Sequence, residues 1–136
     1  MKFDFEIISH AKQRYDTCGD YFRKGKEIAF RVSRMEDRRY CWLVFLHEII
    51  EWTICKLTGV KVGDIDRFDK KYERFRAERW SIAPCGCKLQ DEPGEDIHAP
   101  YWRAHQVATK CERLIAEVLD VDWIDYEEAV YSLSDK

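Results

Sequence analysis

Three features that would assign the chain to a broad class of protein are missing from its sequence. No apolar run reaches the roughly 18–20 residues that cross a bilayer, because HEIIE at positions 47–51 interrupts the longest one. The first residues, MKFDFEIIS, have neither the basic start nor the apolar centre of a secretory signal. There is also no block of like charges, and the net charge is only −3. These absences predict a cytoplasmic protein without a membrane span, and they give no indication of nucleic-acid binding.

Paired cysteine motifs are scarce as well. Of the six cysteines, Cys41, Cys55 and Cys111 lie in helical apolar patterns, where a free cysteine packs like a small hydrophobic residue. Only Cys85 and Cys87 form a close pair, and a CxC segment without a second pair is a weak indication of zinc. We therefore expect reduced thiols in a loop there, rather than a metal or redox site.

The features that are present predict a single folded domain over residues 1–136. The sequence is 46% hydrophobic and 14% aromatic, without internal repeats or low-complexity segments, and it is long enough to bury a core of its own. Apolar and polar residues alternate over 3–7 and 27–33, which predicts two strands. The segment 15–22, followed by a turn that contains glycine, predicts a third strand. The three strands are expected to form a small antiparallel sheet.

Helical patterns dominate the remainder of the chain. The S-x-x-E sequence at 33–36 has the form of a capping box and predicts a helix over 35–57, with Gly59 as its stop. Apolar residues surround this helix almost completely, so it should be central and buried. Further helices are expected over 65–79, 100–119 and 122–133. The prediction is an α+β fold in which the small N-terminal sheet packs on three to four helices.

The central helix carries three ionisable residues, His47, Glu48 and Glu51, within the apolar stretch WLVFLHEIIEWTIC. Burial of an unpaired charge is costly, so such groups are usually paired, hydrogen-bonded or bound to a metal. His47 and Glu51 are four residues apart and share one helix face, whereas Glu48 lies about 100° around the axis. This is the arrangement of the HExxH zinc motif, with a glutamate in place of the second histidine. Zn²⁺ accepts carboxylate as well as imidazole ligands, so we expect His47 and Glu51 to bind zinc and Glu48 to act as the catalytic base.

A third ligand must come from another of the four histidines. His105 lies beside the apolar face of the predicted helix 100–119, and a helix holds a ligand more rigidly than a loop does. We therefore expect zinc to be bound by His47, Glu51 and His105, with water in the fourth position. The loop residue His98 is the second choice. Carboxylates that could hydrogen-bond the ligands are Glu112, Asp69 and Glu73.

Structural roles for the same residues remain alternatives. A single histidine in a buried helix is more often a hydrogen-bonded core residue than a metal ligand. Glu48 or Glu51 could instead form an ion pair with Arg103 or Arg113. The acidic residues at positions 66, 69 and 73 fit best as the solvated face of an amphipathic helix.

A resemblance to a protein family is carried by three segments within residues 40–126, namely FLHEIIEW, DIDRFDKKYE and DEPGEDIHAPYWRAHQVATKCERLIAEVLDVDW. They are similar to small proteins of phages and prophages that resemble a minimal zincin. The resemblance implies HExxE on the first long helix, a small sheet whose edge strand precedes that helix, and a third ligand from a later helix. The histidine that follows the APY segment corresponds to His105, whereas His98 is not part of the pattern. No particular substrate is implied.

Three functions fit these residues. The first is a zinc-dependent peptidase or amidase, in which a peptide pairs with the edge of the sheet, although a carboxylate in place of the second histidine lowers the Lewis acidity of the metal. The second is a metal-binding domain without catalysis, whose fourth ligand position is closed by His98 or Asp96. The third is a Mg²⁺-dependent nucleotide pyrophosphohydrolase, for which the carboxylates would be Glu48, Glu51, Asp66, Asp69 and Glu112. This third function would leave the two histidines of the site without a role.

Overall fold

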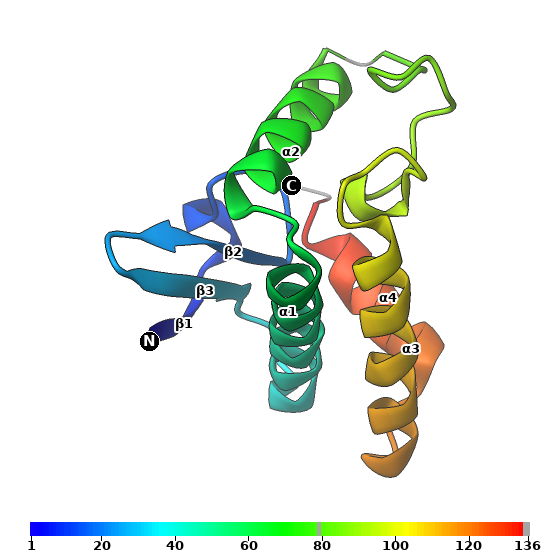
Figure 1. The fold of residues 1–136 in the computed structure, drawn as a ribbon. Helices are drawn as coiled ribbons and strands as arrows, with labels where there is room; N and C mark the ends of the chain where they lie inside the picture. The colour runs from blue at the N-terminus through cyan, green and yellow to red at the C-terminus, as the bar shows by residue number, and fades with distance from the viewer. Residues whose placement is uncertain (79, 135–136) are drawn as a thin grey trace.

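The computed structural model describes residues 1–78 and 80–134, and it has an α+β fold (Figure 1). A three-stranded sheet at the N-terminal end is followed by helices. The strands are β1 Lys2–Ile8, β2 Gly19–Lys24 and β3 Glu27–Ser33. The helices are α1 Arg38–Thr58, α2 Val62–Ala77, α3 Trp102–Val118 and α4 Trp123–Ser132, and short 3-10 turns cover His10–Lys12 (η1) and Pro93–Glu95 (η2). The predicted α+β class is confirmed.

The sheet is mixed, with the strand order β1-β3-β2. β2 runs antiparallel to β3, as predicted, but β1 pairs with β3 in parallel, from Lys2 opposite Glu27 to Ile8 opposite Ser33. The expected purely antiparallel sheet is therefore wrong. Alternation of apolar residues determines which face of a strand is buried, but it does not determine the neighbouring strand or its direction. The chain reverses between β1 and β2, and β3 then inserts between the two strands.

The helix α1 follows the central strand β3 and not an edge strand, which differs from the layout that the resemblance implies. Its N-cap is Asp37, whose carboxylate accepts a hydrogen bond from the backbone N–H of Arg39. The predicted capping box is wrong, because Ser33 stays in β3 and its hydroxyl donates to the carbonyl of Thr17 at 3.2 Å. The predicted stop is confirmed, since Gly59 ends the helix in the left-handed conformation with a φ of 82°.

The helix α1 lies at the centre of the molecule, as its apolar pattern predicts. The sheet packs on one side of it and α3 packs along another (Figure 1). Two apolar clusters, one around Phe30 of β3 and one around Leu43 of α1, both include residues of this helix. The side chains of α1 that face α3 are therefore in the interior.

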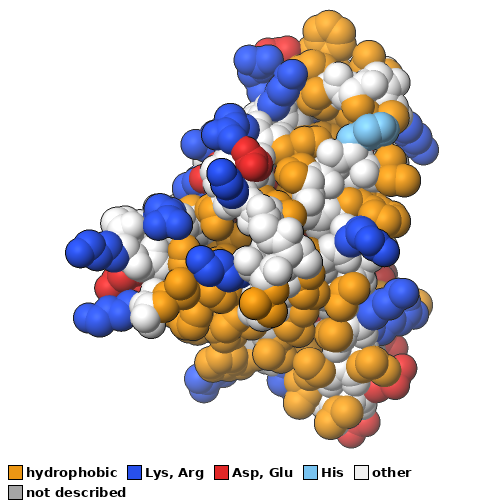
Figure 2. Space-filling view, in the orientation of Figure 1, with side chains coloured by type: hydrophobic (Ala, Val, Ile, Leu, Met, Phe, Trp, Pro, Cys, Tyr) orange, Lys and Arg blue, Asp and Glu red, His pale blue; other side chains and the backbone are white. Residues whose placement is uncertain are grey.

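The surface carries its charges unevenly. On the face shown in Figure 2, Lys and Arg side chains gather around the β2–β3 turn, and hydrophobic side chains cover a broad area over and around α1. Exposed hydrophobic residues of α3 are Val107, Leu114 and Val118. Within the ranges that the structure describes, none of the helices combines the length and the apolar character needed to cross a membrane.

Candidate metal centre

The helices α1 and α3 bring three ligand atoms together at one point. His47 and Glu51 lie one turn apart on α1, and His105 faces them from α3. The His47 Nε2 atom is 3.2 Å from Glu51 Oε2 and 3.1 Å from His105 Nδ1, and the latter two atoms are 3.0 Å apart. All three residues are buried, with exposed fractions of 8% for His47, 4% for Glu51 and 7% for His105. We call these residues the His-Glu-His cluster.

The triangle of ligand atoms fits a tetrahedral metal ion. Zinc bonds to nitrogen and oxygen are about 2.0–2.1 Å long, so two ligand atoms of one zinc ion are roughly 3.3 Å apart. The separations of 3.0–3.2 Å in the His-Glu-His cluster are close to this value. Two imidazoles and one carboxylate also form a donor set that zinc accepts. The structure thus brings the three predicted ligands together, and zinc binding itself stays a prediction.

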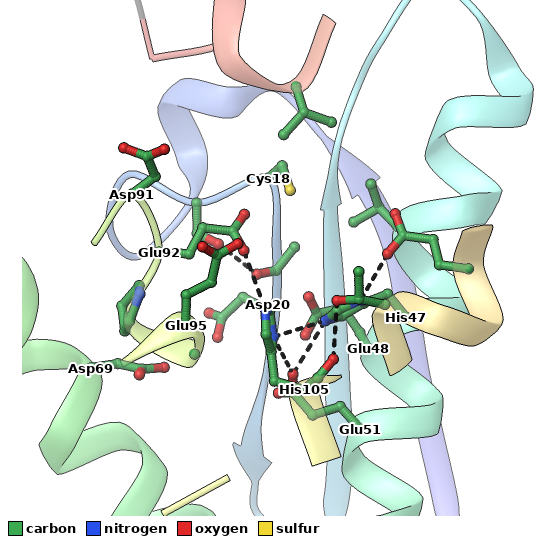
Figure 3. A pocket seen from close by; sticks show the side chains of 18 of the residues that line it. Cys18, Asp20, His47, Glu48, Glu51, Asp69, Asp91, Glu92, Glu95 and His105 are labelled. Carbon is green, nitrogen blue, oxygen red and sulfur yellow. Dashed lines mark hydrogen bonds and ion pairs between the residues drawn. The ribbon is translucent and has the colours of Figure 1, made fainter. Parts of the chain in front are cut away.

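Each of the two histidines has a carboxylate near its other ring nitrogen. His47 Nδ1 is 2.8 Å from Glu112 Oε1, and the second oxygen of Glu112 accepts a hydrogen bond from the hydroxyl of Tyr126 in α4. His105 Nε2 is 3.6 Å from Glu92 Oε2, in the loop between α2 and α3. Figure 3 shows His105 with Glu92 on one side and His47 on the other. Such carboxylates hold a ligand histidine in one tautomer and orientation.

Hydrogen bonds within the cluster govern its charges. Glu51 Oε1 accepts a 2.7 Å hydrogen bond from the hydroxyl of Tyr21 in β2. Burial raises the pKa of Glu51, but the hydrogen bonds with His105 and His47 outweigh this effect and hold the pKa at about 2. Burial lowers the pKa of His47, whereas its contacts with Glu112 and Glu51 hold that pKa well above the ordinary value. These contacts favour the protonated form of His47, and a bound cation would take the place of the added proton.

Glu48 lies beside the cluster and lines a cavity. Burial and the neighbouring charge of Glu51 raise the pKa of Glu48 well above its ordinary value. A Cβ atom on Gly19 of β2 would come within 2.7 Å of Glu48 Oε1, so glycine at this position leaves room for the carboxylate. A carboxyl group with a raised pKa holds a proton more readily than an ordinary carboxylate does, which suits a group that accepts and returns a proton.

The cavity that the cluster lines has a volume of about 710 Å³, which is within the range of small-ligand sites. β2, α1, α2, α3, α4 and the loop before α3 contribute to its wall. The acidic residues of the wall are Asp16, Asp20, Glu48, Glu51, Asp69, Glu73, Asp91, Glu92, Glu95, Glu112 and Glu127. The arginines of the wall are Arg76 and Arg113. The wall is therefore strongly acidic.

His98, the second choice for the third ligand, lies in a separate group. Its Nδ1 atom is 3.2 Å from Asp96 Oδ1 and 3.7 Å from Cys87 Sγ. The alternative of an ion pair between Glu51 and an arginine is not supported. The hydrogen bonds of the Glu51 carboxylate are made with a tyrosine and the two cluster histidines. Arg113 instead lies over the ring of Trp123.

Asp66, Asp69 and Glu73 of α2 do not form the solvated face that the sequence predicts, because all three line the cavity or pair with an arginine. Asp69 is buried, and it accepts hydrogen bonds from the hydroxyls of Tyr101 at 2.6 Å and Tyr15 at 3.0 Å. Asp66 pairs with Arg14 at 3.0 Å. An amphipathic pattern cannot distinguish water from the polar wall of a cavity, because both accept charged side chains.

Glu92 and Tyr21 are not among the predicted site residues, although both contact the cluster. Glu92 belongs to the acid-rich segment DEPGED, and that concentration of carboxylates ahead of His105 is the only sequence feature that points to it. Glu112 is among the predicted hydrogen-bond acceptors, but its partner is His47 and not the histidine of its own helix. Pairings between distant elements depend on how the helices pack, which residue spacing does not reveal.

Comparison of the chain with protein-family models, with curated proteins and with solved structures finds no match. The resemblance to phage proteins and the zincin-like layout therefore stay predictions. A function for the chain can therefore be proposed only from the geometry of the His-Glu-His cluster and its cavity.

Proposed function

We propose that the chain is a zinc-dependent hydrolase of peptide or amide bonds. His47, Glu51 and His105 would hold the metal ion, and Glu48 would serve as the general base. The observation that carries the proposal is the convergence of three ligand atoms, 3.0–3.2 Å apart, from two helices at the wall of a cavity. Burying two imidazoles and a carboxylate is costly, and metal binding offsets that cost.

The surrounding residues have distinct roles in this proposal. A bound Zn²⁺ would supply Lewis acidity, which lowers the pKa of water toward neutrality. Glu48 takes a proton from the attacking water and returns it to the leaving amine. Glu112 and Glu92 keep one nitrogen of each cluster histidine directed at the metal position. The hydroxyl of Tyr21 donates a hydrogen bond to one carboxylate oxygen of Glu51, and the other oxygen is left to bind the cation.

The edge of the sheet supports an extended peptide as substrate. β2 is an edge strand, and Gly19, Asp20 and Tyr21 at its start line the cavity. A peptide can add to such an edge through backbone hydrogen bonds. Because Tyr21 touches Glu51, a peptide on β2 would pass the cluster. The acidic wall opposes phosphate groups and favours neutral or positively charged substrates.

The two other functions have less support. A fourth position closed by protein would need His98 or Asp96 beside the cluster, but these residues contact Cys87 and Cys85. A Mg²⁺ site for nucleotide hydrolysis would need the carboxylates of α2, which are bound to tyrosine hydroxyls and to an arginine. The acidic wall is also unfavourable for a nucleotide.

Elemental analysis of the full chain, purified without a metal-affinity tag, tests the proposal. The His47→Ala and His105→Ala variants should each bind one zinc equivalent less than the wild type. His10→Ala is the matched control, because His10 bonds to Ser33 and Asp16 outside the cluster. Equal zinc content in all four proteins would refute the metal site. A screen of peptide and amide substrates would then compare the wild type with the zinc-deficient variants.

A further inference from the structure

The loop between α2 and α3 contains a second group of metal-binding side chains, which the proposed hydrolase does not use. Cys85, Cys87 and His98 each offer one ligand atom, and these atoms all lie within 4.8 Å of one another. Asp96 adds a carboxylate, whose Oδ2 is 3.5 Å from Cys85 Sγ and whose Oδ1 is 3.2 Å from His98 Nδ1. The group therefore combines two thiols, an imidazole and a carboxylate.

The backbone of a tight turn brings the two thiols together. The N–H of Ala83 donates to the carbonyl of Cys87 at 2.8 Å, and the N–H of Gly86 donates to the carbonyl of Ala83 at 2.9 Å. Gly86 has a φ of 90°, a conformation that residues with a Cβ atom rarely adopt. An isolated bridge between Ile82 and Lys88 encloses the turn. The CxC segment is thus held in a shape that directs both sulfur atoms to one place.

The other two side chains come from the segment just before α3. The backbone N–H of His98 donates to Asp96 Oδ1 at 2.8 Å, which fixes the two residues relative to each other. The Asp96 side chain is only 2% exposed. In the described ranges its side-chain hydrogen bonds are with the Cys85 thiol and with the backbone and ring of His98. A buried carboxylate is costly unless it is paired, and a cation among these ligands would pair it.

Although the CxC spacing alone favours reduced thiols, we propose that Cys85, Cys87, Asp96 and His98 form a structural zinc site. Zinc bonds are about 2.3 Å to sulfur and about 2.0–2.1 Å to nitrogen or oxygen, so ligand atoms around a tetrahedral ion are roughly 3.3–3.8 Å apart. Asp96 Oδ1 is 3.8 Å from Cys85 Sγ and 3.2 Å from His98 Nδ1, which in turn is 3.7 Å from Cys87 Sγ. These three distances match three edges of such a tetrahedron. Two thiolates select zinc over Mg²⁺ or Ca²⁺. Four protein ligands leave no position for a substrate, so the role is structural.

The site has a consequence for the His-Glu-His cluster. Its ligands lie at the two ends of the segment 88–95, which contains Glu92 and Gly94. Gly94 packs on the ring of His105, where a Cβ atom would come within 2.7 Å of Nδ1. A zinc ion that joins 85–87 to 96–98 would therefore fix this segment against the third ligand of the cluster.

Titration of the reduced, metal-free full chain with Co²⁺ tests the site. Thiolate ligands give Co²⁺ an intense charge-transfer absorption in the near ultraviolet, and imidazole and carboxylate ligands do not. The wild type and His47→Ala should both develop this absorption, and added Zn²⁺ should abolish it. The double variant Cys85→Ser/Cys87→Ser should lose it. The control Cys111→Ser, on α3, should keep it.

Two results would overturn the site. The first is the absence of thiolate absorption in the wild type, which includes the case in which Cys85 and Cys87 only form a disulfide. The second is undiminished absorption in the double variant. If circular dichroism shows that the double variant does not fold, His98→Ala replaces it, since that side chain is 54% exposed. Loss of this ligand should weaken cobalt binding by roughly tenfold or more. Because His47→Ala affects the other cluster alone, failure of one site does not imply failure of the other.

Discussion

Glu48 and Glu51 are close neighbours on one helix, yet their surroundings shift their pKa values in opposite directions. Against the effect of burial, His105 and His47 lower the pKa of Glu51 to about 2. Burial and the charge of Glu51 raise the pKa of Glu48 well above the ordinary value. Carboxyl groups whose pKa values are pushed apart in this way take different roles in a catalytic site. Glu51 is suited to bind a cation, and Glu48 is suited to exchange a proton.

The substitution Glu48→Gln should separate these roles. The amide fills the same space but cannot accept a proton, so turnover of a peptide or amide substrate should fall by roughly 100- to 10,000-fold. Zinc content should stay at the wild-type level, as elemental analysis would show. Glu36→Gln, at an exposed position before α1, is the control and should leave both quantities unchanged. Loss of zinc in Glu48→Gln, or full activity, would contradict the assigned role.

Glu112→Gln tests the carboxylate behind His47. The amide cannot hold the imidazole as firmly as the charged group does, so zinc affinity should fall by roughly 10- to 100-fold. Competition with a chromogenic chelator measures this change. Glu117→Gln, an exposed glutamate on the same helix, should bind zinc like the wild type. Equal affinities in the two variants would show that the Glu112 contact does not support metal binding.

Asp69 should make stability depend on pH. Burial raises the pKa of Asp69 to about 8, although Tyr101 and Tyr15 lower it, whereas the unfolded chain ionises this group near 3.8. Between these values the folded state binds the extra proton, so the free energy of unfolding falls as pH rises, by up to about 1.4 kcal/mol per pH unit. Asp69→Asn should flatten this fall. Urea unfolding at several pH values between about 4 and 8 measures it, and equal slopes in both proteins would contradict the prediction.

Among the elements, the helices could be predicted more fully than the sheet. The apolar pattern predicts a helix over 35–57, and α1 runs from Arg38 to Thr58. The capping box fails because pairing with its neighbours keeps Ser33 in β3, so Asp37 becomes the cap. The parallel pairing of β1 with β3 depends on contacts between distant segments, and no local pattern encodes them.

Within the cluster, too, the parts set by local helix geometry could be predicted, and the contacts between distant segments could not. His47 and Glu51 could be placed side by side because helix geometry alone sets their separation. His105 required the further assumption that α3 packs against α1, which the structure confirms. Glu92 lies in a loop, where residue spacing does not determine the direction in which a side chain points. The contact with Tyr21 depends on the position of β2 beside α1.

The loop that contains η2 packs against His105, and a substitution in it tests whether this contact supports zinc binding. Gly94→Ala would place a Cβ atom 2.7 Å from His105 Nδ1 and 2.9 Å from the Tyr101 ring, so the loop or the imidazole must move. Zinc affinity should fall by roughly tenfold or more, because ligands must be held within a fraction of an ångström. Gly63→Ala on α2 is the control, since its Cβ atom would meet only Arg67 at 3.5 Å. Equal zinc affinity in both variants would contradict the prediction.

Across the whole molecule, the cluster joins segments that are far apart in the chain. α1 contributes His47 and Glu51, α3 contributes His105, and the hydroxyls that complete the network come from Tyr21 of β2 and Tyr126 of α4. One cation at this point would therefore connect the sheet with three helices.

Removal of zinc should accordingly lower the stability of the entire domain. A ligand that binds only the folded state stabilises it by about 2.7 kcal/mol when its free concentration is 100 times its dissociation constant. Thermal unfolding with zinc and with a chelator measures the effect. His105→Ala should respond less to zinc than the wild type, because any zinc bound at the cysteine loop acts equally on both proteins. An identical shift in the two proteins would contradict the prediction.

The position of β3 between its two neighbours also sets an order during synthesis. β1 leaves the ribosome before its partner exists, and it cannot pair until Glu27–Ser33 has followed. β2 and β3 are joined by a tight turn at Gly25, so their hairpin closes with little loss of chain entropy. β1 must close a longer loop to reach the same strand, which is slower. We therefore expect the nascent chain to form its sheet from the hairpin outward, with β1, the first of the three strands to be made, as the last to pair.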